Sequence, residues 1–319
     1  MQLDQVKSLA EKIKNNISKV IIGKDDIAEL VVMSVMCSGH VLLEDVPGVG
    51  KTVLAKCLAR SVSSSFKRVQ FTPDLLPSDL TGINYFDQKE SKFQFRPGPL
   101  FANILLADEI NRATPRTQAS LLECMEEGQV TVDGVTRRLE SPFFVIATQN
   151  PVETRGTFPL PEAQMDRFFM RLSMGYPSAS EGRDILDRFQ EKNPLPELSS
   201  VVEAKEITEA QSSFGQVYVS REVKDYIIEI IEATRKSDKA LLGVSPRGSL
   251  ALLKAAQICA VMRSRDFVTP DDVKYMAVPV LAHRIILKGN AAISNTASAE
   301  KFITEILDKV PAPVEELQR

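Results

Sequence analysis

The sequence contains no tryptophan, only two histidines and only four cysteines among its 319 residues. His40 and His283 are isolated in the chain and too few to suggest a transition-metal site. No two cysteines lie within four residues of each other, so the chain lacks the closely spaced pairs of zinc knuckles and redox motifs. All four lie in helix-like segments, and we expect reduced thiols that act as small apolar fillers.

Long apolar runs and an excess of positive charge are missing as well. No apolar run approaches the roughly 20 residues of a membrane-spanning helix. The first residues lack the basic-then-apolar order of a signal peptide, so we expect a cytoplasmic protein. The net charge of −3 argues against a broad nucleic-acid-binding face, although a local basic loop is compatible with it. The length allows two domains.

The most informative segment is residues 44–52, Glu-Asp-Val-Pro-Gly-Val-Gly-Lys-Thr, which follows an apolar run. An apolar strand, a glycine-rich turn and Lys-Thr at a helix start are typical of a site for a nucleotide triphosphate. Backbone N–H groups of the turn and the helix N-terminus face phosphate oxygens. Lys51 can reach the β- and γ-phosphates, and the Thr52 hydroxyl can ligate Mg²⁺. The full pattern has glycine at position 45, where this chain has Asp45.

Two further apolar runs end in polar residues. Residues 103–109 end in Asp108 and Glu109. Because the carboxyl ends of parallel strands face the ligand crevice, Asp108 is a candidate Mg²⁺ ligand and Glu109 a candidate base that polarises water. The competing interpretation is an acidic pair at a surface strand end. Residues 143–150 end in Asn150, which could fix the water or contact the γ-phosphate, or could simply form a turn before Pro151.

Two arginines are candidates for stabilising charge on a transferring phosphoryl group. Arg167 ends the segment Pro-Glu-Ala-Gln-Met-Asp-Arg, and Arg247 follows Gly-Val-Ser-Pro. A well-placed arginine raises the rate of phosphoryl transfer by about 10³–10⁵. For either arginine alone, a solvated or salt-bridged surface group is the competing interpretation.

Strand-like and helix-like runs alternate from residue 40 to about residue 172, which predicts an α/β architecture with a parallel sheet. We expect strands at 40–43, 66–71, 104–107, 143–148 and 168–172, and helices at 52–61 and 115–127. Two amphipathic helices precede them, with apolar positions at 6–17 and 27–36. Hairpins at 83–95 and 129–139 interrupt the pattern, and the second has the strong turn signal Asp-Gly.

Helical periodicity dominates after residue 175. Helices are expected at 181–190, 208–214, 221–235, 247–264, 271–278 and 299–310. Ser-Pro at 245–246 and Thr-Pro at 269–270 each place a capping residue before a first-turn proline. We therefore expect an α/β domain over residues 1–175 and a helical domain over residues 176–319.

Together these segments resemble the AAA+ ATPases, and in particular their MoxR branch. The matching segments follow the family's order between residues 43 and 248: Leu-Leu-Glu-Asp-Val-Pro-Gly-Val-Gly-Lys-Thr, Gly-Pro-Leu-Phe, Leu-Leu-Ala-Asp-Glu-Ile-Asn-Arg-Ala, Ala-Thr-Gln-Asn-Pro, Leu-Pro-Glu-Ala-Gln-Met-Asp-Arg-Phe and Val-Ser-Pro-Arg-Gly. The resemblance implies a P-loop AAA+ core followed by an all-α lid domain, with ATP or ADP and Mg²⁺ as ligands. It also implies that Asp45 is tolerated in this branch.

The resemblance implies a role for each site residue. The nucleotide would contact the adenine-pocket segment and the phosphate loop, namely Ile21, Ile22, Gly23, Pro47, Gly48, Val49, Gly50, Lys51, Thr52 and Val53. Thr52 and Asp108 would bind the metal, and Glu109 would activate water. Asn150 would be the first sensor, Arg167 a finger offered to a neighbouring subunit, and Arg247 the second sensor on the lid.

The resemblance also implies an assembly and a function. If Arg167 serves a neighbour, hydrolysis needs a ring, expected to be a hexamer, with a hinge near Gly175. The two hairpins resemble insertions that face the pore of such rings. We expect a chaperone-like remodeller of partner proteins, which in this branch often carry a von Willebrand factor A domain. The alternatives are a nucleic-acid-directed ring ATPase, with phosphate contacts from the basic residues of the hairpins (Lys89, Lys92, Arg137 and Arg138), and a nucleotide-gated scaffold that does not hydrolyse ATP.

Overall fold

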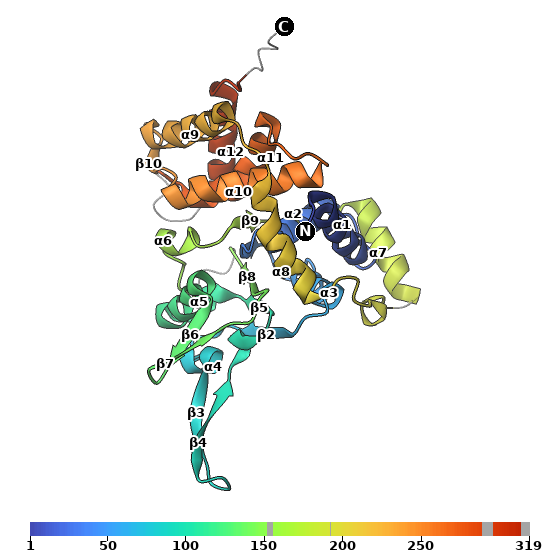
Figure 1. The fold of residues 1–319 in the computed structure, drawn as a ribbon, viewed down its shortest axis with the longest axis vertical. Helices are drawn as coiled ribbons and strands as arrows, with labels where there is room; N and C mark the ends of the chain where they lie inside the picture. Colours follow the sequence, from blue (N-terminus) through green and yellow to red (C-terminus); the bar gives the residue numbers. More distant parts are fainter. Residues whose placement is uncertain (152–155, 192, 289–295, 314–319) are drawn as a thin grey trace.

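The computed structural model describes residues 1–151, 156–191, 193–288 and 296–313 (Figure 1). At its centre lies a five-stranded sheet in the order β2-β5-β8-β1-β9, with all neighbouring strands parallel. The strands are β1 (Val41–Glu44), β2 (Phe66–Gln70), β5 (Ile104–Asp108), β8 (Phe144–Gln149) and β9 (Met170–Leu172). This confirms the predicted parallel α/β sheet. Strand β9 begins at Met170, two residues after the predicted start at residue 168, because the Phe168 N–H donates a turn hydrogen bond to the Met165 carbonyl oxygen.

Helices cover both faces of the sheet, so β1 and β5 are buried along their whole length. Alternate side chains of a strand point to opposite faces. Leu43 and Leu106 belong to a core shared with α1 (Leu3–Ser18), α2 (Asp25–Met36) and α3 (Lys51–Ser61). Leu42 and Leu105 belong to a second core, shared with α4 (Pro77–Thr81) and α5 (Pro115–Glu127).

Both predicted hairpins form. One consists of β3 (Gly82–Asp87) and β4 (Lys92–Pro97), and Figure 1 shows it extending away from the rest of the molecule. The other consists of β6 (Gln129–Val132) and β7 (Val135–Arg138). Asp133 and Gly134 both have positive φ, 51° and 77°, as a tight two-residue hairpin turn requires.

The C-terminal part is helical, as predicted. Its helices are α7 (Ala179–Glu191), α8 (Ala204–Ser213), α9 (Arg221–Lys236), α10 (Pro246–Met262), α11 (Pro270–Leu281) and α12 (Thr296–Lys309). The short helix α6 (Glu162–Met165), which the sequence did not predict, lies before β9. Ser245 and Thr269 are the N-caps of α10 and α11, each followed by proline, as the sequence predicts.

Several short elements were not predicted. Strands β10 (Ala240–Leu242) and β11 (Ile286–Leu287) form an antiparallel pair, so the helical part is not purely α-helical. They are too short for a period to show in sequence. Single 3₁₀ turns occur at η1 (Pro99–Phe101), η2 (Ile110–Arg112), η3 (Leu195–Glu197), η4 (Phe214–Gln216) and η5 (Ala282–Arg284).

One continuous core joins the N-terminal helices to the C-terminal ones. Ile13 of α1 and Leu252 of α10 are both fully buried in it. The division of the chain at residue 176 stays a prediction. Within the described ranges, no helix combines the length and the apolar character needed to cross a membrane.

A buried carboxylate holds the turn between α10 and α11 together. Asp272 is fully buried and accepts hydrogen bonds from Arg263 Nη1 at 3.0 Å, Arg265 Nη2 at 2.6 Å and the Thr269 N–H at 2.9 Å. Burial by itself would raise the pKa of Asp272. The hydrogen bonds from Arg265 and Thr269 and the charge of Arg265 outweigh burial and hold this pKa below its ordinary value of 3.8.

We expect Asp272→Asn to lower the free energy of unfolding by about 3 kcal/mol at neutral pH, because it leaves two arginines beside a neutral buried amide. The folded-state pKa lies below the unfolded-state value. The stabilisation is therefore complete above about pH 4 and is lost as the pH falls through the folded-state pKa. Denaturant unfolding of wild type and variant, at neutral pH and near pH 3, measures the difference and its decrease in acid. Equal stabilities at neutral pH would contradict this role.

Candidate nucleotide-binding site

A cavity of about 380 Å³ lies beyond the carboxyl ends of β1, β5 and β8. It is lined by Pro47, Gly48, Gly50, Lys51, Thr52, Val53, Arg68, Gln70, Asp108, Glu109 and Asn150. These residues come together because β8 lies between β5 and β1, so the glycine-rich turn, the acidic pair and Asn150 follow three adjacent strands. Ligands bind at this edge of open parallel sheets.

The glycine-rich turn has the conformation that a phosphate loop needs. Gly48 and Gly50 have φ of 86° and 100°, in the left-handed region that favours glycine, and Gly50 is the N-cap of α3. Lys51 Nζ donates to the carbonyl oxygens of Asp45 at 2.7 Å and Val46 at 3.3 Å. Burial lowers the pKa of Lys51, and the nearby carboxylates oppose that shift, Asp45 the most. Because of its two hydrogen bonds to carbonyl oxygens, the Lys51 ammonium group lies against the glycine-rich turn that precedes it.

Asp108 presents one oxygen to the sheet and one to a basic side chain. Its Oδ1 accepts a hydrogen bond from Thr148 Oγ1 at 2.6 Å, and its Oδ2 accepts two from Arg68, from Nη2 at 2.7 Å and from Nε at 3.0 Å. Asp108 and the Thr52 hydroxyl line the same cavity. Hard oxygen donors of this kind suit Mg²⁺, so the residues fit the metal that the sequence predicts.

Glu109 is held by its backbone and by its carboxylate. Its φ of 57° is left-handed, and its N–H donates to Thr148 Oγ1 at 2.8 Å. Its Oε2 accepts hydrogen bonds from Gln70 Nε2 at 2.6 Å and Arg112 Nη1 at 3.1 Å. A non-glycine residue in this conformation carries strain, and such strain concentrates at functional sites. Glu109 is one of the residues that line the cavity.

Sequence reasoning missed Arg68, Gln70 and Thr148. Gln70 lies directly opposite Asp108 in the register of β2 and β5. Arg68 and Gln70 lie in the edge strand β2, where polar residues are common, and Thr148 lies just before Gln149 at the end of the central strand β8, so none of the three carries a distinctive local signal. Their neighbours depend on the strand order, which the sequence does not show.

Some predicted nucleotide contacts lie outside this cavity. Val49 packs against the core beside it. Ile21 is buried, and a Cβ atom on Gly23 would lie 2.0 Å from Glu181 Oε1, so the adenine-pocket segment packs against the start of α7. A role for these residues in binding the base stays a prediction.

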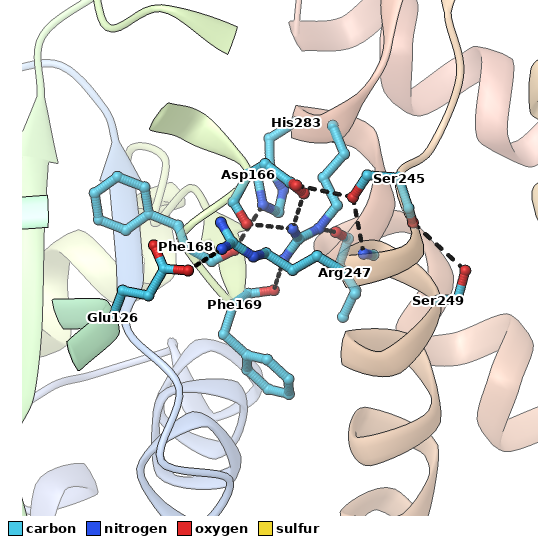
Figure 2. A network of polar contacts seen from close by, with 11 residues as sticks. Glu126, Asp166, Phe168, Phe169, Ser245, Arg247, Ser249 and His283 are labelled. Carbon is cyan, nitrogen blue, oxygen red and sulfur yellow. Dashed lines mark hydrogen bonds and ion pairs between the residues drawn. The ribbon is translucent and has the colours of Figure 1, made fainter. Parts of the chain in front are cut away.

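Arg167 and Arg247 also lie outside the cavity lining, and both contact one carboxylate at the end of α5. Arg167 Nε lies 3.1 Å from Glu126 Oε2. Arg247 Nη2 pairs with Glu126 Oε1, as Figure 2 shows. The two guanidinium groups therefore share a partner on the surface of the molecule.

A polar network fixes the segment before β9 to the helical part. Asp166 accepts a hydrogen bond from Ser245 Oγ, the N-cap of α10, at 2.8 Å, and it forms an ion pair with the buried Arg284. Arg284 also donates to the carbonyl oxygens of Asp166 and Phe168. Figure 2 shows Asp166, Phe168 and Ser245 close to Arg247. Arg167, which follows Asp166, is thus tied to the start of the helix that carries Arg247.

Comparison with known proteins agrees with this architecture. Residues 40–170 match the model of the ATPase family associated with various cellular activities (AAA), and residues 232–306 match the AAA lid domain. The chain is 39% identical to the chaperone MoxR1 of Mycobacterium tuberculosis, over 93% of this chain and 80% of the relative. It belongs to the MoxR family of AAA+ ATPases.

Two further similar proteins extend the comparison. An uncharacterized protein of Bacillus subtilis, YeaC, is 50% identical over 96% of both chains. The crystal structure of a proposed ATPase from Cytophaga hutchinsonii superposes with a TM-score of 0.88 at 36% identity, covering 97% of this chain and 96% of that one. The resemblance to the MoxR family and the order of an AAA+ core and a lid are confirmed. The roles of individual residues stay predictions.

Proposed function

We propose that this MoxR-family protein binds Mg–ATP in the cavity and hydrolyses it to remodel a partner protein. The observation that carries the proposal is the convergence of Lys51, the acidic pair and Asn150 on one cavity beside a left-handed glycine turn. Membership in an ATPase family supports the same conclusion.

The polar groups that line the cavity have different parts in this proposal. The turn amides and Lys51 bind the phosphates, and Thr52 and Asp108 would hold Mg²⁺, which neutralises phosphate charge when bound. Glu109 takes a proton from the attacking water, and Asn150 orients that water. Arg68 is paired with Asp108, so it has to release this carboxylate when the carboxylate becomes a metal ligand.

The positions of the two arginines support a ring. Neither Arg167 nor Arg247 lines the cavity of its own chain, and both lie on Glu126. We therefore assign Arg167 to the nucleotide of a neighbouring subunit, and Arg247 remains the proposed second sensor on the lid. The resemblance to ring-forming AAA+ ATPases makes a hexamer our expectation.

The first hairpin favours a protein partner over a nucleic acid. Phe93 is 74% exposed and Phe86 51% exposed near its tip. Two of the candidate phosphate-binding cations are engaged by the chain itself: Lys92 of the first hairpin pairs with Glu90, and Cζ of Arg137, from the second hairpin, lies 3.9 Å from the centre of the Phe95 ring. Exposed apolar groups of this kind mark protein contacts. A client with a von Willebrand factor A domain remains part of the proposal, as does a cytoplasmic location.

Calorimetry tests the nucleotide site. We expect wild type to bind one Mg–ATP per subunit, and Lys51→Ala to bind it at least about tenfold more weakly, because a charge-assisted phosphate contact is lost. Lys56→Ala is the matched control, since Lys56 is exposed on the same helix. Failure of folded wild type to bind Mg–ATP would refute the proposal. ATPase activity stimulated by DNA and not by any protein would favour the nucleic-acid alternative.

A further inference from the structure

The carboxylate of Asp45, at the position where phosphate loops have glycine, points away from the cavity. It accepts hydrogen bonds from Ser173 Oγ at 2.9 Å, the Met174 N–H at 2.5 Å and the Gly175 N–H at 3.2 Å. Only 6% of Asp45 is exposed. These three donors belong to the segment that leaves β9 and leads into the helical part, which we call the linker (residues 173–175).

Backbone geometry does not account for the residue type at this position. Gly48 and Gly50 have left-handed φ, but Asp45 does not, so a side chain causes no strain there. The side chain has an electrostatic cost, since a carboxylate in a phosphate loop repels a triphosphate and loses hydration when buried. The linker donors compensate for the burial. Asp45 therefore weakens triphosphate binding and in exchange connects the phosphate loop to the linker.

Two neighbouring contacts strengthen this connection. The Met174 side chain lies against Gly50, 3.7 Å from where a Cβ atom of that glycine would stand. Glu44, the residue before Asp45, is also buried, pairs with Arg171 of β9 and accepts a hydrogen bond from Thr296 Oγ1 of α12 at 2.8 Å. Two successive carboxylates at the end of β1 are thus held by β9, the linker and α12.

The linker also reaches the predicted adenine-pocket segment. Lys24 Nζ, directly after Gly23, donates to the Tyr176 carbonyl oxygen at 3.2 Å and lies 3.9 Å from Glu181 of α7. The chain from Ser173 to Tyr176 therefore contacts the phosphate loop and Lys24, the residue next to the predicted adenine-pocket segment.

We infer that Asp45 is a positioning residue that ties the phosphate loop to the linker and transmits nucleotide occupancy to the helical part. The inference rests on the proposed nucleotide site. Lys51 Nζ holds the main-chain oxygen of Asp45, while the side chain of Asp45 holds the linker. When a phosphate replaces the Asp45 carbonyl oxygen as the partner of Lys51, Asp45 loses its main-chain contact with Lys51 while its side chain still holds the linker. The linker then responds to the phosphate without touching it.

Amide hydrogen exchange on the full-length protein, with and without Mg–AMP-PNP, tests this coupling. In wild type, we expect nucleotide to change the exchange rates of Met174 and Gly175. In Asp45→Gly, these amides lose their charged acceptor, and we expect them to exchange roughly tenfold faster without nucleotide. We expect this variant to bind nucleotide at least as tightly as wild type in calorimetry, because a repulsive charge is gone. We also expect nucleotide to leave the exchange rates of its Met174 and Gly175 amides unchanged.

Two further variants make the test specific. Asp45→Asn keeps the shape and one acceptor oxygen, so its linker response should be intermediate, and it serves if Asp45→Gly folds poorly. Ser173→Ala removes one hydroxyl donor and leaves both amides bonded, so its response should remain close to wild type. If Asp45→Gly binds nucleotide and its linker responds as in wild type, the inference is wrong and the proposed function stands. If wild type binds no nucleotide, both fail.

Discussion

Replacing Glu109 with glutamine is expected to lower the rate of ATP hydrolysis at least about 100-fold, the usual effect of removing a general base. Glutamine keeps the size of the side chain and can still receive the hydrogen bond from Gln70, but it cannot take a proton from water. Mg–ATP affinity should therefore stay within a few-fold of wild type, and ATP-bound rings should accumulate. Steady-state turnover, calorimetry and light scattering measure the three quantities.

A matched control separates this effect from a general loss of negative charge. Glu123 is exposed on α5 and does not line the cavity, so Glu123→Gln should hydrolyse ATP at the wild-type rate. Wild-type turnover in Glu109→Gln would show that another group activates the water. A folded wild-type protein that binds Mg–ATP but does not hydrolyse it would instead support the scaffold alternative.

Arg167→Ala is expected to abolish hydrolysis in rings made of this variant alone, with a loss of about 10³-fold or more. The reason is the position of Arg167 beside Glu126, outside the cavity of its own chain. Mixing this variant with Lys51→Ala subunits should restore activity. An intact site on an Arg167→Ala subunit then receives the arginine of a Lys51→Ala neighbour. For equal mixing and independent sites in a head-to-tail ring, about a quarter of the interfaces are complete.

The control for this experiment is a surface arginine with no such role. Arg221 begins α9, its side chain is 90% exposed, and its partner Asp225 lies one turn along the same helix. Arg221→Ala should hydrolyse ATP normally in rings of its own. If mixtures of Arg167→Ala and Lys51→Ala subunits stay inactive while both variants fold and assemble, Arg167 does not act on a neighbouring subunit.

Much of the fold follows from local patterns. The apolar runs of β1, β5 and β8 predict buried strands because helices cover both faces of the sheet there. Asp133-Gly134 predicts its hairpin because both residues accept positive φ. Ser245 predicts the start of α10 by capping it. The short pair β10–β11 could not be predicted, since it forms only where α9 and η5 bring its strands together.

The candidate site divides in a similar way. Lys51, Asp108 and Asn150 can be recognised because each follows an apolar strand at the end where ligands bind. Gln70 could not be recognised, because its place opposite Asp108 depends on β2 lying next to β5. The shared contact of Arg167 and Arg247 with Glu126 joins residues from α5, the segment before β9 and α10. No spacing along the chain reveals it.

The sequence by itself determined the strands, the left-handed glycine turn and the membership in an ATPase family. These depend on short-range sterics, periodicity and motif order, all of which can be read within a few neighbouring residues. Only the tertiary structure decided which partners several polar side chains have: Arg68 pairs with Asp108, Glu126 pairs with two arginines, and Asp45 accepts hydrogen bonds from the linker. A buried carboxylate takes whichever donors the packing brings to it, and chain order does not determine which donors those are.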